Sequence, residues 1–164
     1  MKDASDPILT FLAAAESSFT FLGTWGFQRL DAVTENGDPR DAATTVTFKR
    51  ERRVVAVRLS HIGLGLSLLL GDAAPGLALK NVIDFDEYLL AFHRSDLTPP
   101  FPEMGKDVVF SGLANRDPKK YFRVIRPRLE QAVGVLAERF TRYGHEVVDM
   151  DLGALRARIG RPRP

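Results

Sequence analysis

The chain has 164 residues, contains no cysteine and carries a formal net charge of +2, from 23 basic and 21 acidic side chains. This length predicts one domain with one core, and the lack of thiols excludes disulfides, Cys-ligated metals and thiol nucleophiles. Hydrophobic residues make up 45% and charged residues 27% of the chain, which is typical of a soluble globular protein. The balanced charge argues against a protein dedicated to nucleic acid or to a membrane surface. We expect one domain over residues 1–160 and a flexible tail over residues 161–164.

The N-terminus and the longest apolar run both argue against export and membrane insertion. The opening MKDASDP is acidic where a secretory signal would be basic. The most apolar run, residues 62–70, is too short to cross a hydrocarbon layer of about 30 Å. The sequence therefore predicts a cytoplasmic protein that makes no membrane contact.

The first predicted element is a helix over residues 7–23. Asp6 can cap its N-terminus, Pro7 suits the first helical position, and Gly23 can end it. A strand is predicted over 27–34, where the turn-forming residues 35–39 close it.

Three more strands follow, over residues 43–50, 54–61 and 64–70. In the first two, apolar and polar side chains alternate, which is typical of a half-buried strand. The turns between them are short, and parallel strands would need long crossovers. The sequence therefore predicts an antiparallel meander of about four strands.

Two further main helices are expected. Asp84 and Glu87 form a capping box, with Ile83 and Tyr88 as a hydrophobic staple, at the start of a helix over 85–93. The proline-rich connection over 96–116, with one strand-like piece at 108–110, is a candidate contact surface because loops of this length are uncommon.

The longest predicted helix begins at Asp117-Pro118 and runs to Gly144. Pro127 lacks an amide donor, so we expect a kink or a break near Arg126. An extended link over 145–150 should lead to a short last helix capped by Asp151. The predicted fold class is α+β, with an antiparallel meander of about four strands and with the N-terminal helix and two further main helices packed on one face.

The sequence offers little sign of a reaction centre. His61, His93 and His145 are far apart and lack the spacing of paired metal ligands. Gly63 and Gly65 do not continue into a phosphate-binding loop and are interpreted as a tight turn or bulge. No serine lies in the G-x-S-x-G pattern of many hydrolases.

Two Asp-x-Asp pairs could in principle hold Mg²⁺. They are Asp84 with Asp86 and Asp149 with Asp151, and helix capping already accounts for Asp84 and Asp151. We therefore predict no catalytic residue, no metal and no cofactor.

The strongest charge feature is a run of cations at the start of the longest helix. Positive charge at a helix N-terminus opposes the helix dipole, so capping does not explain it. A basic patch of this kind could meet an acidic protein, a phosphate group or nucleic acid, or it could simply be a solvated helix face. The candidate partner-binding residues are Lys119, Lys120, Arg123, Arg126 and Arg128.

The pattern of the chain resembles that of small bacterial α/β proteins, some of which are candidate immunity proteins encoded beside polymorphic toxins. The resemblance rests on apolar rhythm and a few glycines: GF at 26–27, VTF at 46–48, VAVRL at 55–59, LSLLLG at 66–71, VIDFDEYLL at 82–90, RYGHEVV at 142–148 and DL at 151–152. It implies a non-enzymatic protein that binds another protein, and it assigns no functional residue.

Three functions stay open at this point. The first is a non-enzymatic protein-binding module, an immunity or accessory protein that neutralises a partner protein. The second is a nucleic-acid or phosphate-ligand module that uses the basic run at 119–128. The third is an enzyme whose site forms only in three dimensions, around His61 and the region of Asp149. A homodimer is also compatible with the sequence.

Overall fold

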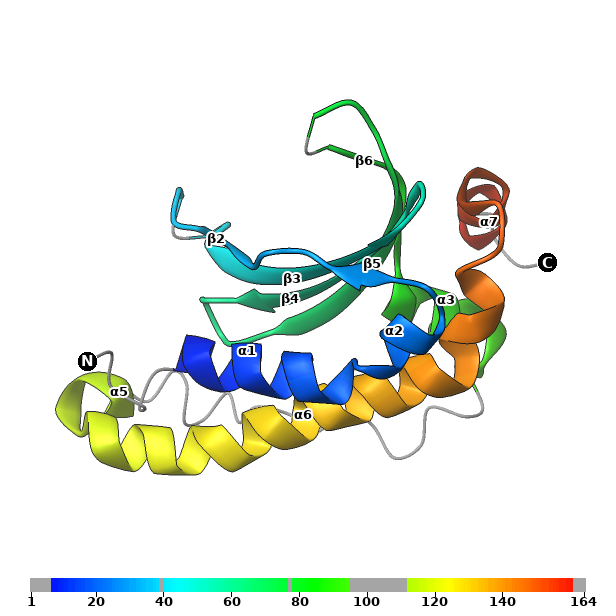
Figure 1. Ribbon diagram of the computed structural model, residues 1–164. Helices are drawn as coiled ribbons and strands as arrows, with labels where there is room; N and C mark the ends of the chain where they lie inside the picture. The colour runs from blue at the N-terminus through cyan, green and yellow to red at the C-terminus, as the bar shows by residue number, and fades with distance from the viewer. Residues whose placement is uncertain (1–6, 39, 77, 95–111, 161–164) are drawn as a thin grey trace.

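An antiparallel sheet lies over a layer of helices in the computed structural model, which describes residues 7–38, 40–76, 78–94 and 112–160 (Figure 1). This arrangement confirms the predicted α+β class. The helices are α1 (Pro7–Ser18), α2 (Phe21–Thr24), α3 (Phe85–Phe92), α5 (Leu113–Arg116), α6 (Pro118–Val147) and α7 (Leu152–Ile159). The strands are β1 (Gln28–Arg29), β2 (Val33–Glu35), β3 (Ala43–Arg50), β4 (Arg53–Ser60), β5 (Leu66–Ala73) and β6 (Leu79–Asp84).

The sheet is a meander in which β3, β4, β5 and β6 pair in chain order, and β1 and β2 both pair with β3. All pairs are antiparallel. Between β3 and β4 the turn holds only Glu51 and Arg52, and Glu51 has a φ of 52°. The predicted strand over 43–50 therefore exists with the predicted bounds, and those over 54–61 and 64–70 exist with shifted ends.

The described residues hold more strands than the four expected. The predicted strand over 27–34 is divided into β1 and β2, which pair with different parts of β3. β6 was not predicted, because its sequence LKNVID does not alternate cleanly. Asn81 has a φ of 53° and the pairing with β5 shifts register between Leu70 and Asp72, so a bulge interrupts the alternation.

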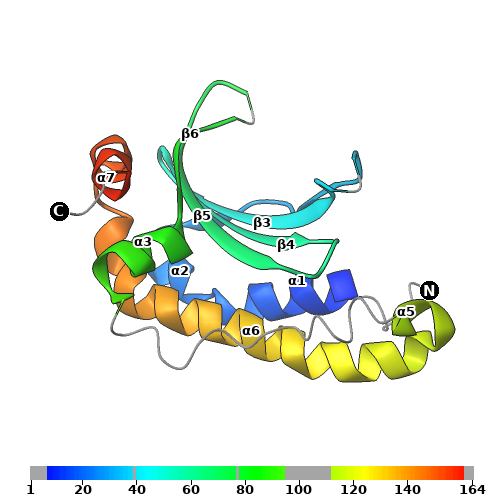
Figure 2. The ribbon, with the colours of Figure 1, turned by 180° about the vertical axis from the view of Figure 1, so that it is seen from behind.

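The two faces of the sheet differ in what covers them. The helix-side face carries the buried core, for example Val46, Val57 and Leu68, which pair across neighbouring strands. α1 and α6 lie under this face in both views, and no described helix lies over the other face (Figures 1 and 2). That uncovered face carries Thr45, Thr47, Lys49, Val54, Ala56, Arg58, Ser67 and Leu69.

The N-terminal helix ends earlier than predicted. α1 stops at Ser18 and a separate short turn of helix, α2, follows. Ser17 and Thr20 donate their hydroxyls to the carbonyl oxygens of Ala14 and Ser17, at 3.2 and 3.4 Å. Such side-chain bonds compete with the helical backbone, which explains the interruption.

α6 is longer than predicted and continuous through Pro127, so the expected break is absent. Pro127 and Arg123 are both exposed, so water can solvate the carbonyl oxygen that Pro127 leaves without a donor. Ile125 and Leu129, on either side, are fully buried and hold the helix against the core. The predicted extended link over 145–150 is also partly wrong, because its first three residues are helical.

Three of the predicted N-caps are confirmed, and the fourth, Asp6, lies outside the described residues. Asp84 accepts a hydrogen bond from the Asp86 amide at 2.9 Å, and Asp117 accepts one from the Lys120 amide at 3.1 Å. Asp151 caps α7 in the same way. Residues 96–111 of the predicted contact surface, including its strand-like piece at 108–110, and the tail over 161–164 lie outside the described residues.

Candidate functional site

The predicted cations lie on the N-terminal half of α6. Lys119, Lys120, Arg123 and Arg126 are exposed, while Arg128 is half-buried. Their positions on the helix follow from its length, because α6 runs without interruption through all of them. Helical geometry therefore decides which of them share a face.

Three of the cations form one stripe. Lys119, Arg123 and Arg126 are spaced i, i+4 and i+7, so they lie above one another on the helix surface. Lys120 lies on the flank of this stripe, about 100° around the helix from Lys119. Arg128 lies about 200° around from Arg126, on the opposite side. We call Lys119, Arg123 and Arg126 the basic stripe.

A groove runs between α1 and α6 and meets the basic stripe at Arg126. Its cavity volume is about 570 Å³. On the α6 side it is lined by Arg126 and Glu130, whose side chains form an ion pair at 3.0 Å. On the α1 side it is lined by Leu9, Thr10, Ala13, Ala14, Ser17 and Ser18.

The packing of α1 explains why the groove exists. Phe11 and Ala15 are fully buried and belong to the core shared with α6. Ala13 and Ser17, on the other side of α1, are exposed. Their small side chains fill little of the space beside α6, so an open channel remains. The small side chains at 13 and 17 are visible in the sequence, but the sequence alone could not show that α6 lies beside them.

Tyr121 and Phe122 lie within the basic segment and are half-buried. Tyr121 packs against the core, and burial raises the pKa of its phenol. The Tyr121 ring therefore helps to anchor the N-terminal half of α6.

The structure does not bring His61 and Asp149 together. The His61 ring lies 2.9 Å from the hydroxyl of Thr44, near one end of β3. Asp149 pairs with Arg50, at the other end of β3. These ends are six residues, or about 20 Å, apart along the strand. The specific enzyme site considered from the sequence is thus not assembled.

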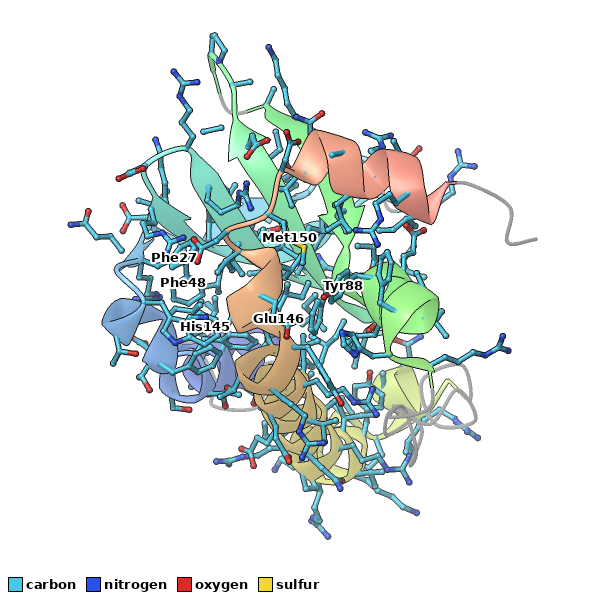
Figure 3. The ribbon with its side chains drawn as sticks, turned by 90° about the vertical axis from the view of Figure 1, so that its right-hand side faces the viewer. Phe27, Phe48, Tyr88, His145, Glu146 and Met150 are labelled. Carbon is cyan, nitrogen blue, oxygen red and sulfur yellow. The ribbon has the colours of Figure 1, made fainter. Side chains whose placement is uncertain are left out.

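The other two histidines lie in separate aromatic clusters. The His145 ring is 4.9 Å from that of Trp25, and the His93 ring is 4.3 Å from that of Tyr143. Figure 3 shows His145 on the α2 side of the end of α6 and Tyr88, which contacts His93, on the α3 side. The histidines therefore contact three different sets of residues.

The cluster around Tyr88 is the most polar of these. The Tyr88 hydroxyl lies 3.4 Å from the His93 ring. Burial raises the pKa of this phenol, and the negative charge of Glu146 acts in the same direction. The charge of Arg158 opposes them, and the phenol is protonated at neutral pH and can donate a hydrogen bond.

No three histidine or acidic side chains in the described part of the chain are arranged to hold a metal ion. Asp84 and Asp151 act as caps, and Asp149 is engaged by Arg50. Gly63, with a φ of 73°, lies in the turn between β4 and β5, as predicted. Across the described ranges, the helices are also too short or too polar to span a bilayer.

Comparisons with protein-family models, with curated proteins and with solved structures each find no match. The resemblance to candidate immunity proteins therefore stays a prediction. The groove between α1 and α6 and the basic stripe beside it are the features from which a function can be argued.

Proposed function

We propose that the protein is a non-enzymatic protein-binding module, an immunity or accessory protein that neutralises a partner, and that an acidic segment of this partner docks in the groove between α1 and α6. The observation that carries this proposal is that the basic stripe continues along α6 to Arg126, which lines the groove. A concave surface next to a stripe of positive charge is suited to a partner of the opposite charge.

The groove can accept a chain segment as well as attract it. Ala13 and Ser17 give it a low wall, and Leu9 adds an apolar contact. Arg126 already pairs with Glu130, whereas Lys119 and Arg123 form no ion pair with any described residue. These two cations are therefore available to a partner's carboxylates.

Each cation should contribute little to the final affinity and more to the rate of association, whereas reversal of all three replaces attraction by repulsion and should prevent stable binding. An exposed ion pair contributes about 0–1 kcal/mol. Charge complementarity can nevertheless raise association rates by factors of about 10 or more, and salt reduces this effect. We expect apolar contacts in the groove to provide most of the binding free energy.

A nucleic-acid or phosphate-ligand module is the second candidate, because the same exposed cations could neutralise phosphates. The apolar part of the groove favours the protein partner over this alternative. Leu9, Ala13 and Ala14 can cover apolar side chains of a chain segment, and their side chains offer no donor to a phosphate.

Affinity purification from cells of the source organism can distinguish a protein-binding module from a nucleic-acid or phosphate-ligand module. Wild-type protein on a resin should retain a stoichiometric protein partner after nuclease treatment, and K119E/R123E/R126E should not. A matched control reverses three exposed cations elsewhere, R52E/K80E/R156E, and should retain the partner.

Titration of labelled DNA and RNA at low salt tests the alternative directly. Binding that weakens steeply with salt and is lost in K119E/R123E/R126E would support the nucleic-acid module. That result, or equal retention of the partner by both charge-reversed variants, would contradict the proposed function.

A further inference from the structure

The outer edge of the sheet, formed by β1 and β2, is unpaired. Both strands bond to β3 on one side, and no described strand pairs with the other. All five of their residues are exposed. In an edge strand, alternate residues direct their N–H and C=O groups outward, where another strand can bond to them.

β2 is held firmly in place. Thr34 shares a hydrogen bond of 3.0 Å with Thr44, which is fully buried and bonded in turn to His61. Thr34 therefore faces the helix side of the sheet, and its neighbour Val33 faces the uncovered side. The edge is thus a preformed template for a further strand.

Two large apolar side chains are exposed at this edge. Leu30 is 43% and Val33 is 49% exposed. Leu30 also donates its amide to Thr47 on β3 at 2.8 Å, so the segment between β1 and β2 stays close to the sheet. An added strand could cover both side chains and exclude water from them.

The exposed charged side chains at this edge indicate what kind of segment it can bind. Asp31 and Glu35 are exposed and form no ion pair with any described residue. Arg29 is engaged by Glu16 of α1, on the helix side of the sheet. Asp31 and Glu35 therefore leave unneutralised negative charge beside Leu30 and Val33.

A second copy of this chain is a poor occupant. Pairing of two β2 edges about a two-fold axis would place Asp31 and Glu35 of one copy beside the same carboxylates of the other. Like charges across a strand pair are destabilising. A basic extended segment has the complementary charge.

We propose that the β2 edge docks an extended, basic segment of a protein partner by strand addition. Backbone hydrogen bonds to β2 hold the segment, its apolar side chains cover Leu30 and Val33, and its lysines or arginines pair with Asp31 and Glu35. This site is separate from the groove between α1 and α6 and selects the opposite charge.

A phage-displayed library of random peptides, selected on the full chain, tests this proposal. Enriched peptides should alternate lysine or arginine with β-branched or aromatic residues. Synthetic peptides of these sequences should bind D31K/E35K at least about tenfold more weakly than wild type. They should bind K119E/R123E unchanged, which separates this site from the groove.

The proposal is overturned if no peptide is enriched, if the enriched peptides are acidic or lack a charge bias, or if D31K/E35K binds them as well as wild type does. Unchanged thermal unfolding of D31K/E35K shows that the loss of binding is local. If the peptides do not bind at the β2 edge, loss of the groove partner in K119E/R123E/R126E would still support the proposed function of the groove.

Discussion

The guanidinium of Arg53, at the start of β4, donates a 2.7 Å hydrogen bond to the carbonyl oxygen of Val148, just after α6. The same side chain donates to the carbonyl oxygens of Val147 and Met150, and it pairs with Asp72 on β5 at 3.2 Å. Because the last carbonyls of a helix have no partners within it, Arg53 acts as a tertiary C-cap. It therefore fixes the end of α6 to the sheet.

Replacement of Arg53 should be strongly destabilising. R53A removes hydrogen bonds from a charged donor that is only 14% exposed and leaves three carbonyls without that donor. We expect a loss of about 2–4 kcal/mol in the free energy of unfolding, measured with urea. R52A, at the exposed neighbouring position, should change it by less than about 0.5 kcal/mol. Equal stability of the two variants would contradict this role.

Substitution by alanine at two glycines of α6 should have opposite effects on the free energy of unfolding. A Cβ at Gly144 would lie 2.5 Å from the ring of Phe140, which is fully buried and packs on Phe85. G144A should therefore cost about 1–3 kcal/mol through overpacking. A Cβ at Gly134 meets nothing within 4 Å, so G134A should gain up to about 1 kcal/mol from helix propensity.

Thermal unfolding of both glycine variants checks this. A lower melting temperature for G144A and a higher one for G134A are expected. A stabilised G144A would show that the ring of Phe140 can move away at no cost.

Asp86 should make stability depend on pH. Burial raises the pKa of this carboxyl, the charge of Asp84 raises it further, and Arg139 opposes both. The folded state therefore holds the proton more tightly than the unfolded state, whose pKa is near 3.8. Stability is lost as the pH rises through the folded pKa.

The substitution D86N removes the carboxyl group whose pKa differs between the folded and unfolded states. The variant and the wild type should be about equally stable below pH 3.8, and the variant should become the more stable one as the pH rises through the folded pKa. Urea unfolding at a series of pH values measures the difference. A wild-type protein that gains stability over D86N with rising pH would contradict the stated cause.

Local chemistry made much of the fold predictable. The caps at Asp84, Asp117 and Asp151 depend on residues within three positions of each other, so the sequence alone defines them. The alternation in β3 likewise follows from one buried and one uncovered face, whereas in β4 Val54 and Ala56 are buried although they lie on the uncovered face.

Tertiary contacts explain what the sequence did not reveal. β6 is held by its register with β5, and the bulge at Asn81 hides its periodicity. The cations at 119–128 were visible as a run, but their division between two sides of α6 required the continuity of the helix through Pro127. The groove depends on the packing of α1 beside α6, and the sequence of neither helix alone predicts it.

The most direct test of the proposed function places a photo-reactive benzoyl-phenylalanine at Ser17, on the wall of the groove, in cells of the source organism. The same group at Glu51, in the turn between β3 and β4, is the control. We expect one adduct at Ser17 with an acidic segment of a protein, and its loss in K119E/R123E/R126E. An adduct that survives these three substitutions, or that forms equally at Glu51, would contradict docking in the groove.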